Sequence, residues 1–309
     1  MAVIEVDGLV KTYGTTTAVD GMTFRVEAGE VYGLLGENGA GKSTTIEILE
    51  GHRRRTHGSV TVLGHDPAHG DRDLQDRIGI MLQKSGIGQQ LTVTEEVTAY
   101  AVAYRRRRDP GEAVEMVGLT ASRDQRVSAL SGGQQRRLDL ALGIVGRPDL
   151  LFLDEPTTGF DPSARRGAWE LIRALGADGT TVVLTSHYLD EVQHLADRVG
   201  VMMRGRMIAE GTTDELISGL GATVVRFVLP DGVTAADVAG VVSHEVSDVA
   251  GVAELTTEAP TRLLHTVTGW AVERGVELSG LTVERPSLED LFLELTAVDR
   301  GRVHDGAPS

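Results

Sequence analysis

Short apolar segments alternate with helix-forming segments through the first two thirds of the chain. Five of the apolar segments are bounded by glycine or polar residues, which is typical of buried strands: residues 31–35, 78–82, 150–153, 181–185 and 199–203. The helix-forming segments that alternate with them are residues 42–50, 94–107, 132–146, 163–176 and 188–197. This order predicts an α/β layer structure whose central sheet is mainly parallel.

Two early stretches, residues 3–10 and 22–27, alternate between apolar and polar positions instead. Alternation of this kind favours antiparallel strands that are covered on one side only. A third strand of the same type is predicted at residues 59–63. The α/β core should therefore carry an antiparallel β subdomain.

The character of the sequence changes after about residue 220. We expect strands at 223–229 and near 281–284 and helices at 234–242 and 262–274. Residues 222–309 hold six Arg against fourteen Asp and Glu, so this segment is strongly acidic. We predict one domain over residues 1–220, a small C-terminal α+β domain over 221–299, and a flexible tail over 300–309.

Composition narrows the class of protein. The 309 residues are 41% hydrophobic and 24% charged, which excludes a fibre or a wholly disordered chain. The absence of cysteine excludes a disulfide scaffold and thiolate metal sites. A net charge of −15 argues against nucleic-acid binding, which needs a basic face. No apolar run reaches the roughly 18–20 residues that span a bilayer, and signal-peptide features are lacking, so we expect a location on the cytoplasmic side.

One loop carries a phosphate-binding signature. Residues 36–43 match G-x-x-x-x-G-K-[ST] directly after a predicted strand and before a predicted helix. Glycines let the backbone N–H groups converge on an anion, and the helix N-terminus adds positive potential. A glycine-rich turn without a ligand is the alternative, which the strand–loop–helix context disfavours. We expect a P-loop NTPase core in which a nucleoside triphosphate contacts Gly36, Glu37, Asn38, Gly39, Ala40, Gly41, Lys42, Ser43 and Thr44.

The side chains of this loop have distinct expected roles. Lys42 should reach the β and γ phosphates as a compact charge, and the Ser43 hydroxyl should ligate Mg²⁺.

A second chemical signal lies where an apolar strand ends in Asp154 and Glu155. The carboxyl edge of a parallel sheet is where ligands bind, so Asp154 is expected to hold Mg²⁺ and Glu155 to act as general base. The alternative is an acidic turn after a strand, with no function in catalysis. The presence of the phosphate loop in the same chain disfavours this alternative. His187 follows the strand at 181–185 and is placed to approach the γ-phosphate, although a lone histidine is usually structural.

The sequence Leu-Ser-Gly-Gly-Gln at residues 130–134 completes a recognisable set. With it, the chain resembles the nucleotide-binding subunit of ATP-binding-cassette (ABC) transporters over about residues 3–218. The family's hallmarks occur in order: Tyr13, the phosphate loop, Gln83, Ser131 with Gly132, Gly133 and Gln134, the acidic strand end, Asp161 and His187. Phe160 stands where the family usually has leucine, an apolar exchange that should be tolerated.

The resemblance assigns roles to the remaining residues. It implies that Tyr13 stacks on adenine, although a half-buried turn tyrosine is the alternative. Gln83 would touch Mg²⁺ and the helical signature subdomain, about residues 84–145. Ser131 and its glycines would bind the γ-phosphate held by a second copy of the chain, so that two copies close head-to-tail around two ATP molecules. Asp161 would lie in the loop that joins the two sites.

The end of the chain carries a further resemblance. Residues 286–296, Pro-Ser-Leu-Glu-Asp-Leu-Phe-Leu-Glu-Leu-Thr, are similar to the closing motif of daunorubicin-resistance-type exporter ATPases. In that subfamily a lone cassette pairs with separately encoded membrane-spanning permease subunits, which implies a peripheral location at the cytoplasmic face of the membrane. An amphipathic helix explains the same residues, and both interpretations hold together. The arginines at 105–108 are interpreted as a solvated helix end, with a partner or lipid contact as the alternative.

The resemblance implies an ATPase that energises an exporter of drugs or other hydrophobic compounds. A soluble ABC ATPase acting on ribosomes or DNA is the alternative. The acidic charge and the single cassette argue against that alternative. The intact Glu155 argues against a third candidate, a nucleotide-binding regulator without turnover.

Overall fold

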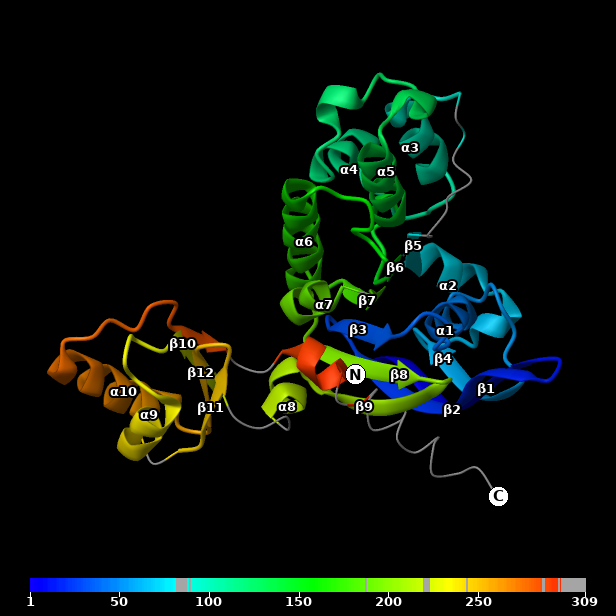
Figure 1. Cartoon of the computed structure of the whole chain (residues 1–309). Coiled ribbons are helices and arrows are strands. Elements are labelled where there is room, and N and C mark those ends of the chain that lie inside the picture. Colours follow the sequence, from blue (N-terminus) through cyan, green and yellow to red (C-terminus); the bar gives the residue numbers. More distant parts are fainter. Residues whose placement is uncertain are drawn as a thin grey trace. The chain divides into compact units, whose positions relative to one another are not determined.

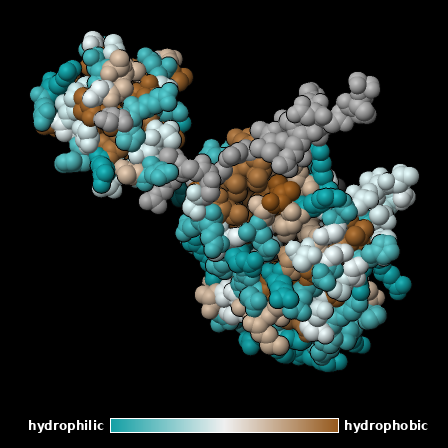
Figure 2. All heavy atoms as spheres, turned by 90° about the horizontal axis from the view of Figure 1, so that it is seen from below, coloured by the Kyte–Doolittle hydropathy of each residue, from teal (hydrophilic) through white to brown (hydrophobic). Residues whose placement is uncertain are grey.

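The computed structural model describes residues 1–81, 88, 90–186, 188–218, 223–242, 244–284, 287–293 and 295. The chain divides into two compact units, Met1–Thr213 and Asp214–Ser309 (Figure 1). No helix among the described residues is long and apolar enough to cross a membrane. On the face drawn in Figure 2, hydrophobic residues gather mainly in one area of the larger unit, and the rest of that face is largely hydrophilic.

A six-stranded sheet forms the centre of the larger unit, in the spatial order β5-β6-β7-β3-β8-β9. The first five strands are parallel, and β9 runs antiparallel to β8. Every residue of β3 is buried, as expected for a parallel strand that is covered on both faces. The strands are β3 (Val31–Gly36), β5 (Ile78–Met81), β6 (Leu150–Asp154), β7 (Thr181–Thr185), β8 (Arg198–Met203) and β9 (Arg206–Thr212).

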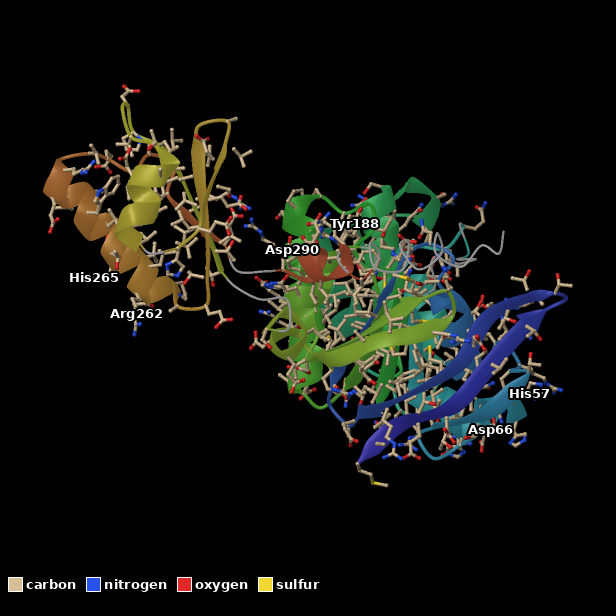
Figure 3. The ribbon with its side chains drawn as sticks, turned by 60° about the horizontal axis from the view of Figure 1, so that its bottom comes forward. His57, Asp66, Tyr188, Arg262, His265 and Asp290 are labelled. Atoms are coloured by element: carbon tan, nitrogen blue, oxygen red, sulfur yellow. The ribbon has the colours of Figure 1, made fainter. Side chains whose placement is uncertain are left out.

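A separate three-stranded antiparallel sheet, in the order β2-β1-β4, packs over this core. It consists of β1 (Ala2–Tyr13), β2 (Thr16–Glu27) and β4 (His57–Val62). Phe24 of this sheet stacks on Tyr32 of β3 with ring centroids 5.5 Å apart, so the two sheets share one hydrophobic core. Beside the first residue of β4, His57, Arg55 donates two hydrogen bonds of 2.8 and 2.7 Å to Asp66 (Figure 3).

The helices of the larger unit fall into two groups. One group flanks the central sheet: α1 (Lys42–Leu49), α2 (Arg72–Arg77), α6 (Pro162–Ala177) and α7 (Leu189–Leu195). The other forms the helical subdomain at the top of Figure 1: α3 (Val93–Ala101), α4 (Pro110–Met116) and α5 (Gly132–Val145), which pack against one another. Short 3₁₀ turns occur at Pro67–His69, Thr120–Ser122 and Val127–Ala129.

The predicted helix at 94–107 is wrong beyond residue 101, where α3 ends. The arginine run at 105–108 is therefore not a helix end. Arg105 donates its backbone N–H to Asp76 at 2.9 Å, and the Arg106 guanidinium donates to Asp149 at 2.8 Å. Asp76 and Asp149 lie far from this segment in the sequence. The local composition, which favours a helix, therefore does not show that these contacts hold the segment in an irregular conformation.

The smaller unit has the order βαββαβ after α8 (Thr213–Ser218). Its sheet runs β11-β12-β10-β13 with every neighbouring pair antiparallel, the ferredoxin-like split βαβ arrangement. Buried Phe227 and Trp270 belong to its separate hydrophobic core. The elements are β10 (Thr223–Val228), α9 (Ala235–Val242), β11 (Val246–Val249), β12 (Val252–Thr257), α10 (Pro260–Arg274) and β13 (Thr282–Glu284).

The predicted fold class is therefore confirmed: a parallel α/β core with an antiparallel sheet, a helical subdomain and an α+β C-terminal unit. Sequence reasoning did not predict α2, α4, α8, β9, β11 or β12. The predicted tail at 300–309 lies outside the described residues.

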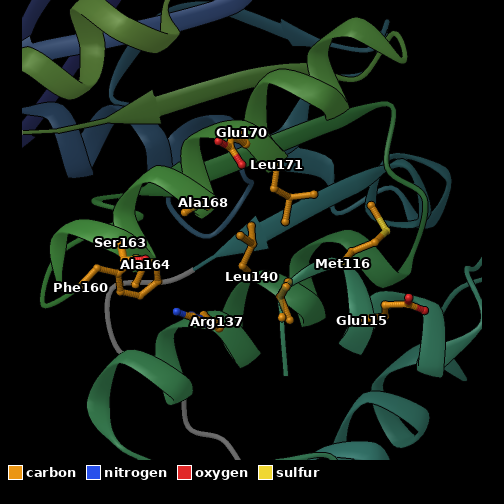
Figure 4. A pocket seen from close by; sticks show the side chains of 13 residues that line it. Glu115, Met116, Arg137, Leu140, Phe160, Ser163, Ala164, Ala168, Glu170 and Leu171 are labelled. Atoms are coloured by element: carbon orange, nitrogen blue, oxygen red, sulfur yellow. The ribbon is translucent and has the colours of Figure 1, made fainter. Parts of the chain in front are cut away.

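A cavity of about 390 Å³ separates the helical subdomain from α6 (Figure 4). Its walls include Met116 of α4, Leu140 of α5 and Ala168 of α6. Phe160 packs with Ala164 and Ala168 in a small cluster on one side of the cavity. The larger residue in place of the family's leucine is thus accommodated where the packing is loose.

Two glycines give a matched test of this packing. A Cβ added at Gly167, in α6 beside the cavity, meets nothing within 4 Å, whereas one at Gly79 lies 2.1 Å from the Gly143 carbonyl oxygen. Gly167→Ala should stabilise the fold by up to about 1 kcal/mol through helix propensity. Gly79→Ala should destabilise it by about 1–3 kcal/mol through overpacking. Urea unfolding followed by circular dichroism measures both, and a destabilised Gly167→Ala protein would contradict the description of the cavity.

Candidate functional site

The phosphate loop joins the end of β3 to the start of α1, and its glycines are required by geometry. Gly39 and Gly41 have φ values of 83° and 106°, a region that side chains rarely allow. A Cβ at Gly41 would also lie 2.4 Å from the carbonyl oxygen of Ala18 in β2. Gly41 is the N-cap of α1, and no side chain caps this helix start. The loop therefore presents its backbone N–H groups and a helix N-terminus together, as an anion site needs.

Lys42 lies inside the loop and is only 7% exposed. Its Nζ donates to the carbonyl oxygens of Gly36 at 2.6 Å and Glu37 at 3.1 Å. Burial lowers the pKa of Lys42, while the nearby charges of Glu155 and Asp154 act in the opposite direction. The structure therefore brings the loop lysine and both predicted carboxylates into one electrostatic site.

Asp154 is held by the neighbouring strand. The Thr185 hydroxyl of β7 donates a short hydrogen bond to Asp154 Oδ1. The Ser43 hydroxyl is exposed in the first turn of α1. The described residues include no group of three or more His, Cys, Asp or Glu that could hold a metal by themselves. This donor set fits Mg²⁺, which is usually held by one or two protein oxygens together with phosphate oxygens.

Glu155 adopts a left-handed backbone conformation, with φ at 50°. Its N–H donates to the Thr185 carbonyl at 3.0 Å, and its carboxylate accepts from the Thr158 hydroxyl at 3.3 Å. A non-glycine residue in this region is strained, and such strain is common at functional sites. The hydrogen bond from Thr158 within this turn holds the Glu155 carboxylate.

Arg136 is a site residue that sequence reasoning missed. This side chain of α5 is 7% exposed, and its guanidinium donates to the backbone carbonyls of Asp154 and, at 2.8 Å, Glu155. Burial lowers the pKa of Arg136, and the neighbouring Asp139, 3.8 Å away, opposes that shift. An Arg–Asp pair at i,i+3 on the buried face of a helix was the available signal. Arg136 links the helical subdomain to the acidic strand end.

The signature residues form the start of α5. The Ser131 Oγ accepts from the Gln134 N–H at 3.3 Å, and Gln134 Oε1 accepts from the Ser131 N–H at 2.9 Å, so the two make a capping box. Gly132 is exposed, and an added Cβ there would meet nothing within 4 Å. Packing within this chain therefore does not require glycine at position 132.

Two of the other predicted site residues have partners within their own part of the chain. Asp161 caps α6 by accepting from the N–H groups of Ser163 and Ala164 at 2.9 Å each, and these bonds lower its pKa. Tyr13 ends β1, is 40% exposed, and has the Lys11 Nζ 4.9 Å from its ring centroid. Gln83 and His187 lie outside the described residues.

A buried acid lies at the far end of α1. The Glu50 side chain is 3% exposed, and its Oε2 is 3.1 Å from His52 Nδ1. Burial raises the pKa of Glu50 to about 8, with the charges of Asp154 and Glu47 adding to the effect. The folded protein therefore retains a proton at neutral pH that the unfolded chain releases.

This proton makes stability depend on pH. Between about pH 4.5 and 8 the folded state binds more protons than the unfolded state, so Glu50 makes the free energy of unfolding fall as pH rises. Glu50→Gln should remove this component and should gain most over the wild type at pH 8 and above. Urea unfolding at pH 5 and pH 8, without nucleotide or Mg²⁺, measures the difference. An equal effect of the substitution at both pH values would refute the protonated state.

Comparison with known proteins agrees with this geometry. The chain matches the ABC transporter family over residues 19–158 and the C-terminal domain of the ABC transporter domain-containing protein-like family over residues 223–287. It is 42% identical over 306 residues to a daunorubicin/doxorubicin resistance ATP-binding protein of Streptomyces peucetius, covering 95% of this chain and 92% of that protein. It is 38% identical over 305 residues to a Nod factor export ATP-binding protein of Paraburkholderia xenovorans, covering 96% and 97%.

Solved structures share the fold of the larger unit. An ATP-binding subunit of an ABC transporter superposes with a TM-score of 0.65 at 26% identity, covering 70% of this chain and 92% of that one. A dimeric, post-hydrolysis ATP-binding cassette with bound ADP and Pi matches with a TM-score of 0.63 at 24% identity, covering 68% and 98%. The second likeness bears on the fold alone. With the full-length relatives and the assembled phosphate loop and carboxylates, the chain belongs to the ABC transporter family and is an ATP-binding, ATP-hydrolysing subunit.

Proposed function

We propose that this ATPase energises the export of drugs or other hydrophobic compounds through separately encoded membrane-spanning permease subunits. The observation that carries the proposal is similarity along nearly the whole chain, C-terminal unit included, to proteins named for daunorubicin resistance and Nod factor export. The first name refers to resistance to daunorubicin and doxorubicin, and the second to export of Nod factor. The subunit would work at the cytoplasmic face of the membrane, bound to its permease.

The geometry of the phosphate loop supports the following roles for the residues of the ATP site. The glycines and the start of α1 surround the phosphates, and Lys42 exchanges contacts with loop carbonyls for the β and γ phosphates. Ser43, Asp154 and Gln83 would hold Mg²⁺. When bound, Mg²⁺ neutralises charge that develops on the phosphate oxygens.

Glu155 is proposed to be the general base. Its carboxylate is half-buried and is held by Thr158, and the strained backbone places it beside Lys42 in the same electrostatic site. From there it accepts a proton from the water that attacks the γ-phosphate. His187, which follows β7 in sequence, is proposed to contact the γ-phosphate, and Tyr13 to stack on adenine.

A second copy of the chain would complete each site. The N-terminus of α5 is exposed at Ser131 and Gly132, and the open space at Gly132 suits close approach by a group from outside the chain. We infer that these residues, with Gly133 and Gln134, bind the γ-phosphate held by the other copy, and that Asp161 lies between the two sites. Closure around ATP would shift the conformation of the permease, and hydrolysis would reset it.

Glu155→Gln separates ATP binding from chemistry, because glutamine keeps the size of glutamate but does not accept a proton. Turnover should fall by about 100-fold or more. The protein with Mg·ATP should accumulate as a dimer in light scattering, since the phosphate loop is intact. The matched control is Glu155→Gln with Lys42→Ala, which should stay monomeric because the phosphate contact is lost. Wild-type turnover in Glu155→Gln would exclude Glu155 as the base, and a monomer in saturating Mg·ATP would contradict the homodimer.

Export is tested with the membrane partner present. Cells that express this chain together with its permease subunits should accumulate less daunorubicin than cells with either component alone. Glu155→Gln should abolish the difference, because export depends on hydrolysis. Fluorescence of cell-associated drug measures accumulation. Unchanged accumulation across a panel of amphiphilic drugs, with both proteins expressed and ATPase activity intact, would argue against drug export.

A further inference from the structure

A carboxylate that no nucleotide motif includes lies behind the catalytic strand. Glu191 of α7 is 0% exposed. Its Oε1 accepts from the Thr157 hydroxyl at 2.7 Å and from the Trp169 indole N–H at 3.1 Å, and its Oε2 accepts from the Ser186 hydroxyl at 2.6 Å. Three donors from three separate segments therefore converge on one buried side chain.

Stability alone does not account for a carboxylate at this position. Removing an ionised group from water costs several kcal/mol, and a well-packed apolar side chain of similar volume is often as stable or more so. Hydrogen bonds, however, fix the relative positions of the segments they join more narrowly than apolar contacts do. The segments that carry the three donors therefore indicate the role of Glu191.

Thr157 belongs to the turn that carries the proposed base. It lies two residues after Glu155 and is itself fully buried. The next residue, Thr158, donates its N–H to the Glu155 carbonyl and its hydroxyl to the Glu155 carboxylate, both at 3.3 Å. Phe160 closes the same turn by donating its N–H to the Thr157 carbonyl at 3.0 Å. Anchoring Thr157 therefore anchors the turn that holds the Glu155 carboxylate.

Ser186 follows the last residue of β7, the strand whose Thr185 binds Asp154. Its hydroxyl donates to Glu191 and also accepts from the N–H of Tyr188, the residue before α7, at 3.0 Å. Through Ser186, Glu191 thus holds the chain just after β7. Trp169, by contrast, lies in the middle of α6, which is neither the turn after Glu155 nor the end of β7.

We propose that Glu191 is a positioning residue for ATP hydrolysis. It ties the turn after Glu155 to Ser186 at the end of β7, so that the base keeps a fixed position relative to that strand end during turnover. Glu191 touches no substrate and acts through Thr157 and Ser186. The proposal rests on the proposed role of Glu155 as the base.

Thr157→Val and Glu191→Gln test the link. Valine keeps the shape of threonine but has no donor, and glutamine leaves the Ser186 hydroxyl without its carboxylate acceptor. Each substitution should lower kcat by about 10- to 100-fold, because small displacements of catalytic groups have effects of that size. The KM for ATP should stay within about twofold, since the phosphate loop is untouched. Steady-state ATPase assays measure both parameters.

Trp169→Phe is the matched control. It removes the third hydrogen bond to Glu191 and keeps an aromatic ring against His194, whose ring centroid is 4.7 Å away. It should lower the melting temperature about as much as Thr157→Val while kcat stays near the wild-type value. A melting curve on each variant shows that the compared proteins are folded.

Several outcomes would overturn the proposal. One is an equal loss of kcat in Trp169→Phe and Thr157→Val at equal melting temperature, which would reduce Glu191 to packing. Another is a rise in KM without a fall in kcat. If Glu155→Gln hydrolyses ATP normally, the base assignment fails. If Glu155→Gln is slow but a folded Thr157→Val turns over at the wild-type rate, only the positioning role fails.

Discussion

The left-handed backbone at Glu155 is the constraint around which the larger unit is arranged. A non-glycine residue in this conformation costs about 1–2 kcal/mol. The compensation comes from elsewhere in the chain. Thr185 of β7 accepts the Glu155 N–H, Arg136 of α5 binds its carbonyl, and Glu191 of α7 holds the following turn through Thr157. The end of β7, helix α5 and helix α7 thus all help to hold the turn that contains Glu155.

This arrangement couples parts of the fold that serve different steps. Arg136 belongs to the helix whose N-cap is Ser131, so one helix contacts the carbonyls of the acidic strand end and also carries the signature residues. The charges of the same acids act on the pKa of Lys42. The cavity beside Leu140 and Ala168 lies between this helical subdomain and α6.

The sequence predicted those parts of the fold that depend on local patterns. Continuous apolar runs predicted the five parallel strands, because such strands are buried on both faces. The phosphate loop was predictable because left-handed turns and a close approach to Ala18 demand glycine. Features that depend on partners distant in the sequence could not be predicted in this way. The end of the predicted helix at 94–107 is an irregular segment, because carboxylates distant in the sequence bind it. Arg136 and Glu191 were not predicted as site residues. Their partners are backbone carbonyls, hydroxyls and an indole that come close to them only in the folded chain.

The capping box at Ser131 has a consequence for how mutations in this family are interpreted. The hydroxyl oxygen of Ser131 is already engaged as an acceptor from Gln134 before any second subunit arrives. Losing such a cap costs about 1 kcal/mol of helix stability. Under the proposed role of Ser131, a phenotype at this serine therefore mixes two free energies, that of ordering the first turn of α5 and that of recognising a phosphate held by the other copy. Separating them requires, as a reference, the free energy of unfolding of the isolated protein without nucleotide, to which only the helix cap contributes. Without that reference, part of the apparent energy of subunit recognition is local folding energy.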